Sequence, residues 1–220
     1  MNNLPKCQDL FTLNDFFRHF LQDYDHPFNI IPSIQEIVRE MLSNGLDGFG
    51  EYKEGVFIGE GVHIADSALI EAPAIIGAYT KIRHGAYLRG SVVIGEGCVI
   101  GNSTEIKNSI IMDRVQAPHY NYIGDSILGN GVHLGAGAIC SNLRSDKANV
   151  RIRVDNDTVD TGMRKLGAIL GDNVEVGCGS ILCPGVIIGK STVVYPLTLA
   201  RGVYPANSIV KQSGEIVERQ

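Results

Sequence analysis

The feature that most constrains this chain is an aliphatic side chain or methionine at every sixth residue. The spacing holds without a break over one long run: Ile58, Ile64, Ile70, Ile76, Ile82, Leu88, Ile94, Ile100, Ile106 and Met112. It resumes in two shorter runs, the first of which ends at a cysteine: Leu128, Leu134 and Cys140, then Leu170, Val176, Leu182, Ile188 and Val194. An amphipathic helix repeats near 3.6 residues and a simple strand near 2, so neither explains a period of six. Short strands joined by tight corners do explain it.

Three such strands in each turn of the chain predict a triangular prism. The aliphatic side chains would point into its narrow core, with each coil hydrogen-bonded to the next as a parallel sheet. The pattern resembles the hexapeptide-repeat family, a mainly β fold known as the left-handed parallel β-helix. The resemblance, and not the spacing, implies the left hand, because crossover connections are generally right-handed. An ordinary β-sandwich is the alternative, but it does not explain one spacing repeated so often.

The first fifty residues lack the period of six and carry helix signals instead. Thr12 with Asp15 and Ser33 with Glu36 have the spacing of capping boxes, and Gly45 is placed to end the second helix. We expect this segment to cover the open end of the coil and to protect its unpaired strand edge. The predicted units are a helical segment at 1–50, the β-helix at 51–212 and a C-terminal tail at 213–220.

Two gaps interrupt the period. The first gap, from Met112 to Leu128, is sixteen residues long, which is not a multiple of six, and it predicts a loop extruded near 113–123. The second gap begins after Cys140 and contains a charged stretch that is too polar to line a core. It predicts a protruding loop near 142–168. Loops held on a rigid scaffold are where binding groups tend to lie.

Charge and composition exclude several classes of partner. The net charge is −5 and no long Lys/Arg run is present, which argues against a nucleic-acid or anionic-membrane surface. A local basic pocket is compatible with this total, but any polyanion that it binds should be small. No apolar run approaches the roughly 18 residues of a membrane span, and the N-terminus does not read as a secretion signal. We therefore expect a cytoplasmic protein with no membrane partner.

Cysteine and histidine spacing predicts no metal site. The five cysteines are scattered without CxxC spacing, so neither a disulfide framework nor a zinc site is indicated. His63, His119 and His133 raise the alternative of a three-histidine site, as in the carbonic anhydrases built on hexapeptide repeats. No second histidine lies within five residues of His119, as that arrangement requires.

The coil also places charged residues in a column. Residues eighteen apart lie on the same edge of the prism, separated by one strand spacing of about 4.8 Å. Glu71, Arg89 and Lys107 therefore stack at one corner. One interpretation is a solvated ladder of charges. The other is an anion held between the two adjacent cations, and a phosphate would suit a planar guanidinium beside a compact ammonium.

Several separated motifs then resemble one known family. The stretches AYLR, EIKNSIIM, PHYNYIGDSILG, GAGAICSNLRSD and GMRKLGAILG lie in order within 86–196. They are similar to the acetyltransferase half of bifunctional sugar-phosphate acetyltransferase/nucleotidylyltransferases, which act in UDP-N-acetylglucosamine biosynthesis, and most of all to the archaeal members. The family's nucleotidylyltransferase domain is not matched, and residues 1–50 are too short to replace it.

The resemblance implies a role for each residue that matches a family motif. His119 corresponds to the catalytic base. Substrate-binding positions fall on Arg89 and Lys107, which would hold the sugar phosphate, on Tyr122 and Asn142, and near Lys147 and Arg151. Positions facing the acetyl-CoA thioester or pantetheine arm fall on Ala136, Cys178 and Pro196. This chain departs from the bacterial pattern at His133, Leu143 and Cys178, and the first and last of these bear on the selectivity for acyl donor or sugar.

The resemblance thus implies an acetyl-CoA-dependent N-acetyltransferase that acts on glucosamine-1-phosphate or galactosamine-1-phosphate. Backbone N–H groups at Gly135-Ala136-Gly137 could polarise the thioester carbonyl. Family members are typically homotrimers, so the loop at 142–165 would complete a neighbour's pocket. One alternative is a non-catalytic β-helix that binds a nucleotide sugar or sugar phosphate for regulation. Another is an enzyme that acylates a different acceptor, such as a nucleotide-linked sugar or a lipid precursor.

Overall fold

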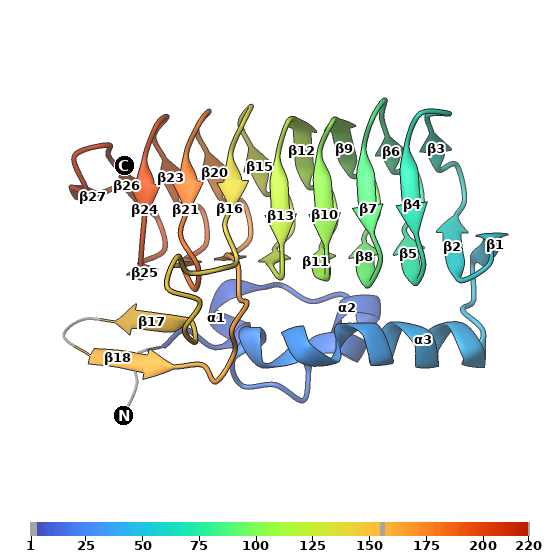
Figure 1. The fold of residues 1–220 in the computed structure, drawn as a ribbon, viewed down its shortest axis with the longest axis horizontal. Coiled ribbons are helices and arrows are strands. Elements are labelled where there is room, and N and C mark those ends of the chain that lie inside the picture. Colours follow the sequence, from blue (N-terminus) through green and yellow to red (C-terminus); the bar gives the residue numbers. More distant parts are fainter. Residues whose placement is uncertain (1–3, 155–156, 220) are drawn as a thin grey trace.

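The computed structural model describes residues 4–154 and 157–219. The chain winds into a coil whose strands form three mainly parallel sheets (Figure 1). Sheet A contains β1 (Phe49–Lys53), β2 (Val56–Gly59), β5 (Ala74–Ile76), β8 (Val92–Ile94), β11 (Ser109–Ile111), β14 (Ile127–Leu128), β19 (Ile169–Leu170), β22 (Ile187–Ile188) and β25 (Val203–Tyr204). Sheet B contains β3 (His63–Ile64), β6 (Lys81–Ile82), β9 (Val99–Asn102), β12 (Gln116–His119), β15 (His133–Leu134), β20 (Glu175–Val176), β23 (Val193–Val194), β26 (Ser208–Val210) and β27 (Ile216–Glu218). Sheet C contains β4 (Leu69–Glu71), β7 (Tyr87–Arg89), β10 (Glu105–Lys107), β13 (Tyr122–Gly124), β16 (Ile139–Cys140), β21 (Ile181–Leu182) and β24 (Leu199–Ala200).

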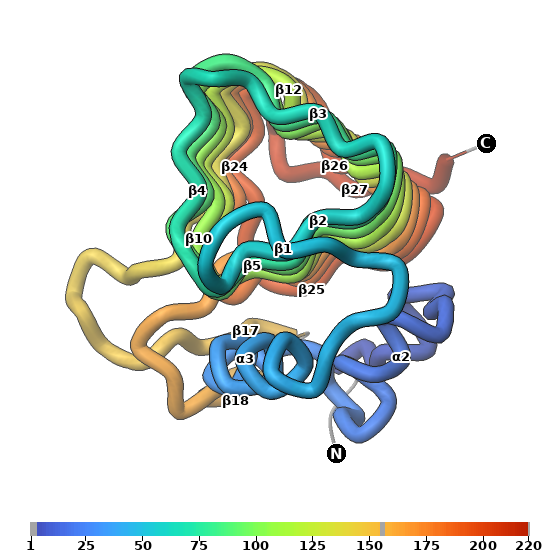
Figure 2. Tube along the Cα trace, turned by 90° about the vertical axis from the view of Figure 1, so that its right-hand side faces the viewer, coloured from blue at the N-terminus to red at the C-terminus, as the bar shows by residue number. Residues whose placement is uncertain are grey.

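The coil is left-handed, as the resemblance implied. Figure 2 looks along its axis with the β1–β2 end of the coil nearest to the viewer. From β2 the chain passes counterclockwise through β3 and β4 to β5 while it recedes, and a counterclockwise receding path is a left-handed screw. Strands in successive coils pair in parallel, so the predicted β-helix is confirmed.

The period of six predicts the core well, with one error. The inward positions of successive coils stack on one another, as Ile76 does on Ile94 and Ile94 on Ile111, and all three side chains are fully buried. Met112 was expected at the third of these positions, but Ile111 occupies it. Met112 is buried on the outer side of sheet A instead. The reason is that Ile111 follows Ile106 by five positions and not by six, so that coil is one residue short.

The loop predicted near 113–123 is wrong for the same reason. Residues of this segment form β12 and β13, which continue sheets B and C in register: His119 pairs with Asn102 and Tyr122 with Glu105. Two successive coils of seventeen residues absorb the irregular spacing, so no loop is extruded. His119 therefore lies on the rigid coil itself.

The coil is shortened at the corner between sheets C and A. Two residues, Gly90 and Ser91, link β7 to β8, whereas Asn108 alone links β10 to β11. Asn108 and Asp125 both have positive φ at this tight corner, a conformation that Asn and Asp tolerate better than most residues. The Asp125 carboxylate accepts hydrogen bonds from the Asn108 amide, at 2.8 Å, and from the Asn142 amide of the next coil. The three side chains form an amide–carboxylate–amide ladder.

The N-terminal helices cover a side of the prism and not its end. They comprise α1 (Cys7–Leu10), α2 (Asp15–Leu21), the 3₁₀ helix η1 (Pro27–Ser33) and α3 (Ile34–Asn44). Their apolar residues pack against outward residues of sheet A, such as Ile75, Val93 and Ile110, and both views show them along this flank (Figures 1 and 2). The expectation that they close the open end is wrong, because sheet A has an apolar outer face that requires a cover. At the open edge, β1 pairs antiparallel with β2.

The helix boundaries differ partly from the capping signals. Asn14, and not Thr12, caps α2, because its side chain accepts a hydrogen bond from the Phe17 N–H at 2.9 Å. Gly45 ends α3 with a φ of 82°, as predicted. None of the helices in the described residues is long and apolar enough to span a membrane.

Between β16 and β19 the chain leaves the coil and forms a hairpin of β17 (Arg151–Val154) and β18 (Asp157–Asp160). Ile152 and Val154 are buried in the same apolar cluster as the N-terminal helices. Leu166 and Ala168 return the chain to sheet A beside Ile127. The insertion is thus anchored on the flank that the helices cover.

The ladder at the tight corner leads to a stability prediction. Asp125→Asn keeps the size of the side chain and its tolerance of positive φ, but replaces an acceptor oxygen with a donor that faces other donors. We expect the free energy of unfolding to fall by about 1–3 kcal/mol, measured by urea denaturation. The control is the exposed Asp66→Asn, for which about 0.5 kcal/mol or less is expected. Equal losses in the two variants would show that the ladder does not stabilise the fold.

Candidate active site on the outer face of sheet C

The outer face of sheet C carries two columns of side chains, one for each outward position of its strands. The first column, called the apolar column here, consists of Leu69, Tyr87, Glu105, Tyr122, Ile139, Ile181 and Leu199. The second column, called the charged column, consists of Glu71, Arg89, Lys107, Gly124, Ser141, Cys183 and Arg201. The predicted stacking of Glu71, Arg89 and Lys107 therefore agrees with the strand register. The charged column lies at the corner between sheets C and A.

His119 lies at the opposite edge of sheet C, at the corner between sheets B and C. It ends β12 and its side chain is exposed. Turns of the following coils stack on this position through backbone hydrogen bonds. The Gly137 N–H donates to the His119 carbonyl at 3.0 Å, the Gly179 N–H to Ala136 at 2.9 Å and the Leu197 N–H to Cys178 at 2.9 Å. This edge thus aligns His119 with the predicted donor-site residues Ala136, Cys178 and Pro196, all of which are exposed.

Asn121 fixes the turn that carries His119. Its side chain is buried; its oxygen accepts from the His119 N–H at 3.2 Å and its amide donates to the Gly135 carbonyl at 2.8 Å. The Asn121 N–H in turn approaches the buried Thr104 hydroxyl at 3.3 Å. The imidazole is therefore displayed from a turn that is hydrogen-bonded to the coils on both sides.

At the corner between sheets C and A, Asp125 organises the predicted acceptor-site residues. Its carboxylate is almost buried and lies 3.6 Å from Lys107 Nζ, in addition to the two amides of the ladder. The Tyr122 phenol and the Asn142 amide lie over Gly124, where a Cβ atom would come within 2.6 Å of both. Burial, then the charges of Asp125 and Glu105, raise the pKa of Tyr122, so the phenol stays protonated at neutral pH.

The two stacked cations have counter-ions within the chain. Arg89 Nη1 lies 2.7 Å from Glu105 Oε1, and the guanidinium also lies over the Tyr87 ring at 5.8 Å from its centroid. Lys107 faces Asp125. These carboxylates relieve the repulsion between adjacent cations, so the repulsion does not by itself require a bound anion. Both cations remain partly exposed, with 41% of the Arg89 side chain and 25% of the Lys107 side chain accessible.

The remaining two predicted residues separate from each other. Lys147 lines a cavity of about 620 Å³ together with Asn108 and Asp125, so it lies near the Lys107 group. Arg151 belongs to β17, pairs with Asp160 at 3.7 Å and lines a different cavity. The insertion therefore brings only one of its two predicted cations to the tight corner.

Within the part of one chain that the structure describes, no side-chain hydrogen bond joins the His119 edge of sheet C to the Lys107 edge. The chain crosses sheet C from His119 to Gly124 through β13, and a strand of three residues is about 10 Å long. Among the described residues, no hydrogen bond connects the His119 imidazole with Lys107, Tyr122 or Asn142. The sequence pattern also missed Glu105, Asn121 and Asp125; the shortened coil was the only available signal for Asp125.

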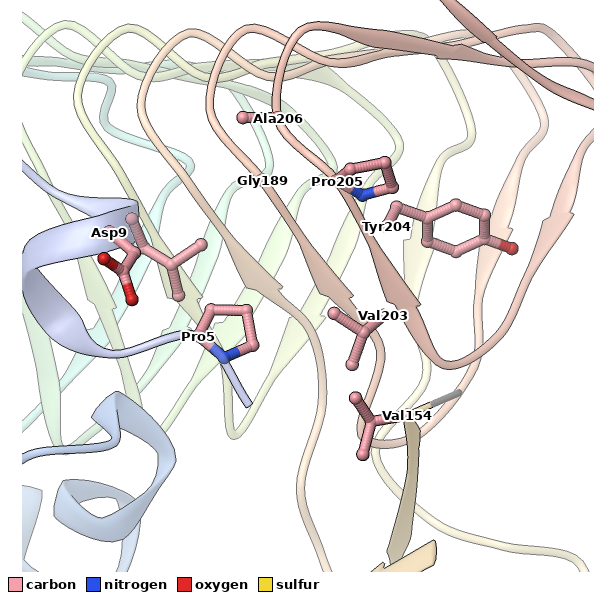
Figure 3. A pocket seen from close by; sticks show the side chains of 9 residues that line it. Pro5, Asp9, Val154, Gly189, Val203, Tyr204, Pro205 and Ala206 are labelled. Atoms are coloured by element: carbon pink, nitrogen blue, oxygen red, sulfur yellow. The ribbon is translucent and has the colours of Figure 1, made fainter. Parts of the chain in front are cut away.

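Other parts of the molecule offer less chemistry. A cavity of about 380 Å³ between α1 and the last coils is lined mostly by apolar groups, including Pro5, Val154 and Val203 (Figure 3). Asp9 is its one acidic lining residue, and that carboxylate accepts from the Lys6 N–H at 2.8 Å. In the described residues, no group of three His, Cys, Asp or Glu side chains could hold a metal ion.

Comparison with known proteins finds one family model and several relatives that are similar to this chain in sequence. The GMPPB C-terminal domain model matches residues 70–161. A bifunctional sugar-1-phosphate nucleotidylyltransferase/acetyltransferase from Sulfurisphaera tokodaii is 33% identical over 184 residues, which are 82% of this chain and 46% of that protein. The bifunctional protein GlmU from Methanococcus vannielii is 32% identical over 216 residues, 98% of this chain and 48% of that protein.

Among solved structures, a mutant of AntD, an N-acyltransferase from Bacillus cereus, aligns with a TM-score of 0.42 and 19% identity, covering 80% of this chain and 92% of that one. The chain spans about half the length of the two sequence relatives above. By sequence, therefore, it is a homologue of the bifunctional sugar-1-phosphate nucleotidylyltransferase/acetyltransferases and corresponds to about half of such a protein.

Proposed function

We propose that this protein transfers an acetyl group from acetyl-CoA to the amine of an amino-sugar phosphate of the glucosamine-1-phosphate or galactosamine-1-phosphate class. The observation that carries the proposal is the edge where His119, Ala136, Cys178 and Pro196 stand exposed in successive coils. An imidazole at the head of a row of turns suits a long donor that lies along the row. The relative from Sulfurisphaera tokodaii supports the choice of reaction, because it is a bifunctional nucleotidylyltransferase/acetyltransferase.

The chemistry requires a neutral amine that attacks the thioester carbonyl. In the proposed step the carbon–nitrogen bond forms, the carbon–sulfur bond breaks, and the proton of the amine passes to the His119 imidazole. Coenzyme A leaves as a thiolate and takes up a proton. A histidine can be neutral at cellular pH and accept a proton, and such general-base catalysis contributes about 10²–10⁴ in rate.

The donor would lie along the His119 edge. The N–H groups of Gly135 and Gly137 are committed to the carbonyls of Val176 and His119. Among the described hydrogen bonds, the Ala136 N–H has no backbone partner. Of the N–H groups of Gly135, Ala136 and Gly137, that of Ala136 is therefore the one suited to polarise the thioester carbonyl. Leu197, 67% exposed beside Pro196, offers apolar contact to the pantetheine arm.

The acceptor phosphate would bind at the charged column. A guanidinium has five N–H donors, and Arg89 uses one on Glu105, so others remain for a phosphate. Lys107 adds a point charge, and Lys147 approaches from the insertion. Tyr122 and Asn142 would orient the sugar between the phosphate and the reacting amine.

The assembly proposed for this reaction is a homotrimer. In the apolar column, Leu69, Ile139, Ile181 and Leu199 are 53%, 37%, 41% and 56% exposed. An aliphatic stripe of this kind on one sheet face is suited to a protein contact. A second copy of the chain against sheet C would bring its own edge, or its segment 142–165, to the first copy's His119 and so complete a site that one chain leaves divided.

A second candidate is a non-catalytic module that binds a sugar phosphate or nucleotide sugar. The observation in its favour is that Glu105 and Asp125 already neutralise the two stacked cations. Release of free thiol from acetyl-CoA in the presence of amino-sugar phosphates separates the two candidates. An acceptor panel that includes nucleotide-linked amino sugars identifies the substrate if thiol is released.

The catalytic assignment predicts the effect of His119→Ala. We expect kcat to fall by about 10²–10⁴ while KM changes little, because the imidazole acts on the transferred proton and not on the phosphate. Thiol release with glucosamine-1-phosphate or galactosamine-1-phosphate is the measurement. His63→Ala removes another exposed imidazole of sheet B and should keep normal turnover. Normal turnover in His119→Ala would refute the assignment.

The phosphate assignment predicts the effect of Arg89→Ala. Loss of a charge-assisted hydrogen bond should raise KM for the sugar phosphate about tenfold or more, with little change in KM for acetyl-CoA. Glu105→Gln is the matched control, since it breaks the same ion pair but keeps the guanidinium. If both variants behave alike, Arg89 belongs to a structural charge ladder and not to the binding site.

The trimer predicts that sheet C is sensitive to charge. Sedimentation velocity of the wild-type protein should show three copies. Ile139→Lys combined with Leu199→Lys should shift the population to smaller species, because lysines would be buried in the contact. Ile216→Lys, at an exposed position of β27, serves as the control. A wild-type protein that sediments as one copy would contradict the proposed assembly.

A further inference from the structure

A cavity of about 500 Å³ lies between the insertion and the last coils of sheet C. Residues from the corner after β16, from β17 and from the corners after β21 and β24 surround it. Its lining includes four guanidinium groups: Arg144, Arg151, Arg153 and Arg201. We call it the arginine cavity. In a chain with a net charge of −5, so many cations around one space are unusual and require a local explanation.

The alternation of β17 explains how the arginines reach the cavity. Ile152 and Val154 face the apolar cluster and are buried, so Arg151 and Arg153 stand on the other face of the strand. Gly202 permits the close approach of β17 to the coil, because a Cβ there would lie 3.0 Å from the Arg153 carbonyl oxygen. The strand is therefore held against the corner that carries Arg201.

The positive charge of the cavity is only partly balanced. Arg144 pairs with Asp146, which lowers the pKa of that carboxyl, and Arg151 lies 3.7 Å from an oxygen of Asp160. For Arg153 and Arg201, no carboxylate lies within 4.0 Å in the part of the chain that the structure describes. Arg201 Nε donates to Cys183 Sγ at 3.3 Å, which orients the guanidinium and leaves its two Nη groups for a ligand.

The other walls of the cavity are different in character. Leu143, Ile181 and Leu199 contribute exposed aliphatic surface, and Ser141 and Ser145 contribute hydroxyl groups. A single phosphate would satisfy the guanidinium groups but would leave the aliphatic wall in water. A ligand with two phosphates and a flat, weakly polar body matches both walls, since arginine forks bind phosphate oxygens in pairs. We propose that the arginine cavity binds a nucleoside diphosphate, free or as the head of a larger molecule.

The arginine cavity is distinct from the proposed acceptor site. Along the charged column, Arg201 lies four coils beyond Lys107, through Gly124, Ser141 and Cys183. At about 4.8 Å for each coil the separation is roughly 19 Å. One phosphate group cannot contact both cations in one chain. The inference therefore goes beyond the acetyl transfer proposed above. Ile181 and Leu199 also belong to the aliphatic stripe proposed for the contact between copies, so the ligand would lie at the rim of that contact.

Isothermal titration calorimetry of the full chain with UDP and with ADP tests the proposal. We expect the wild type to bind at least one of them, and Arg153→Gln combined with Arg201→Gln to raise Kd at least tenfold. Arg201→Lys, which keeps the charge but loses the fork, should fall between the two. Arg39→Gln removes a guanidinium from the exposed face of α3 and should leave Kd unchanged. Thermal unfolding and sedimentation of each variant establish that fold and assembly are kept.

Further titrations separate the sources of the ligand. A comparison of coenzyme A with pantetheine tests whether the cavity binds the nucleotide end of the acyl donor. A uridine diphosphate sugar tests whether it binds a nucleotide-linked sugar. Loss of the binding of either ligand in the double variant supports the proposal. The proposal is overturned if the wild type binds no nucleotide or if the double variant binds as well as the wild type. It is also overturned if inorganic pyrophosphate binds as tightly as UDP, because the aliphatic wall would then contribute nothing.

Discussion

The stacking of inward aliphatic side chains from coil to coil is the interaction on which the rest of this structure depends. Ile76, Ile94 and Ile111 lie one above another, and the backbone pairs in parallel at each level. A coil can lose one residue only at a corner, because a slip within a strand would turn its inward side chain outward. The lost residue between β10 and β11 therefore leaves the core intact and tightens one edge. That edge is where Asn108, Asp125 and the predicted acceptor-site residues gather.

The repeat made most of the fold predictable, because a period in the sequence reports a contact that recurs in space. The same pattern failed where two adjacent residues could both satisfy it: Ile111 and Met112 are each apolar, and only the strand register shows that Ile111 faces inward. The expected position of the N-terminal helices is wrong for a related reason. Sheet A has apolar side chains on both faces, as at Ile75-Ile76, Val93-Ile94 and Ile110-Ile111, and such pairs indicate a strand covered on both sides. The sequence contained this signal, but the period of six conceals it.

The candidate site was predictable only as far as it follows from the register. Spacing alone stacks Arg89 on Lys107. Their partners Glu105 and Asp125 depend on side-chain conformations and on the shortened corner, which spacing does not determine. The roles of His119 and Asn142 came from the resemblance and not from geometry. The hairpin of the insertion could not be predicted as a support for the arginine cavity, because its position rests on contacts between Ile152, Val154 and the distant N-terminal helices.

A prism of this kind separates its edges, and that separation has consequences for catalysis. The His119 edge and the Lys107 edge lie on opposite sides of the outer face of sheet C, and no hydrogen bond among the described residues joins their side chains. In the proposed reaction, the surface of a second copy packed on the face of sheet C would supply groups between the donor on one edge and the acceptor on the other. The exposed aliphatic residues between the two edges are suited to hold such a surface. Assembly and catalysis would then both depend on the outward side chains of sheet C.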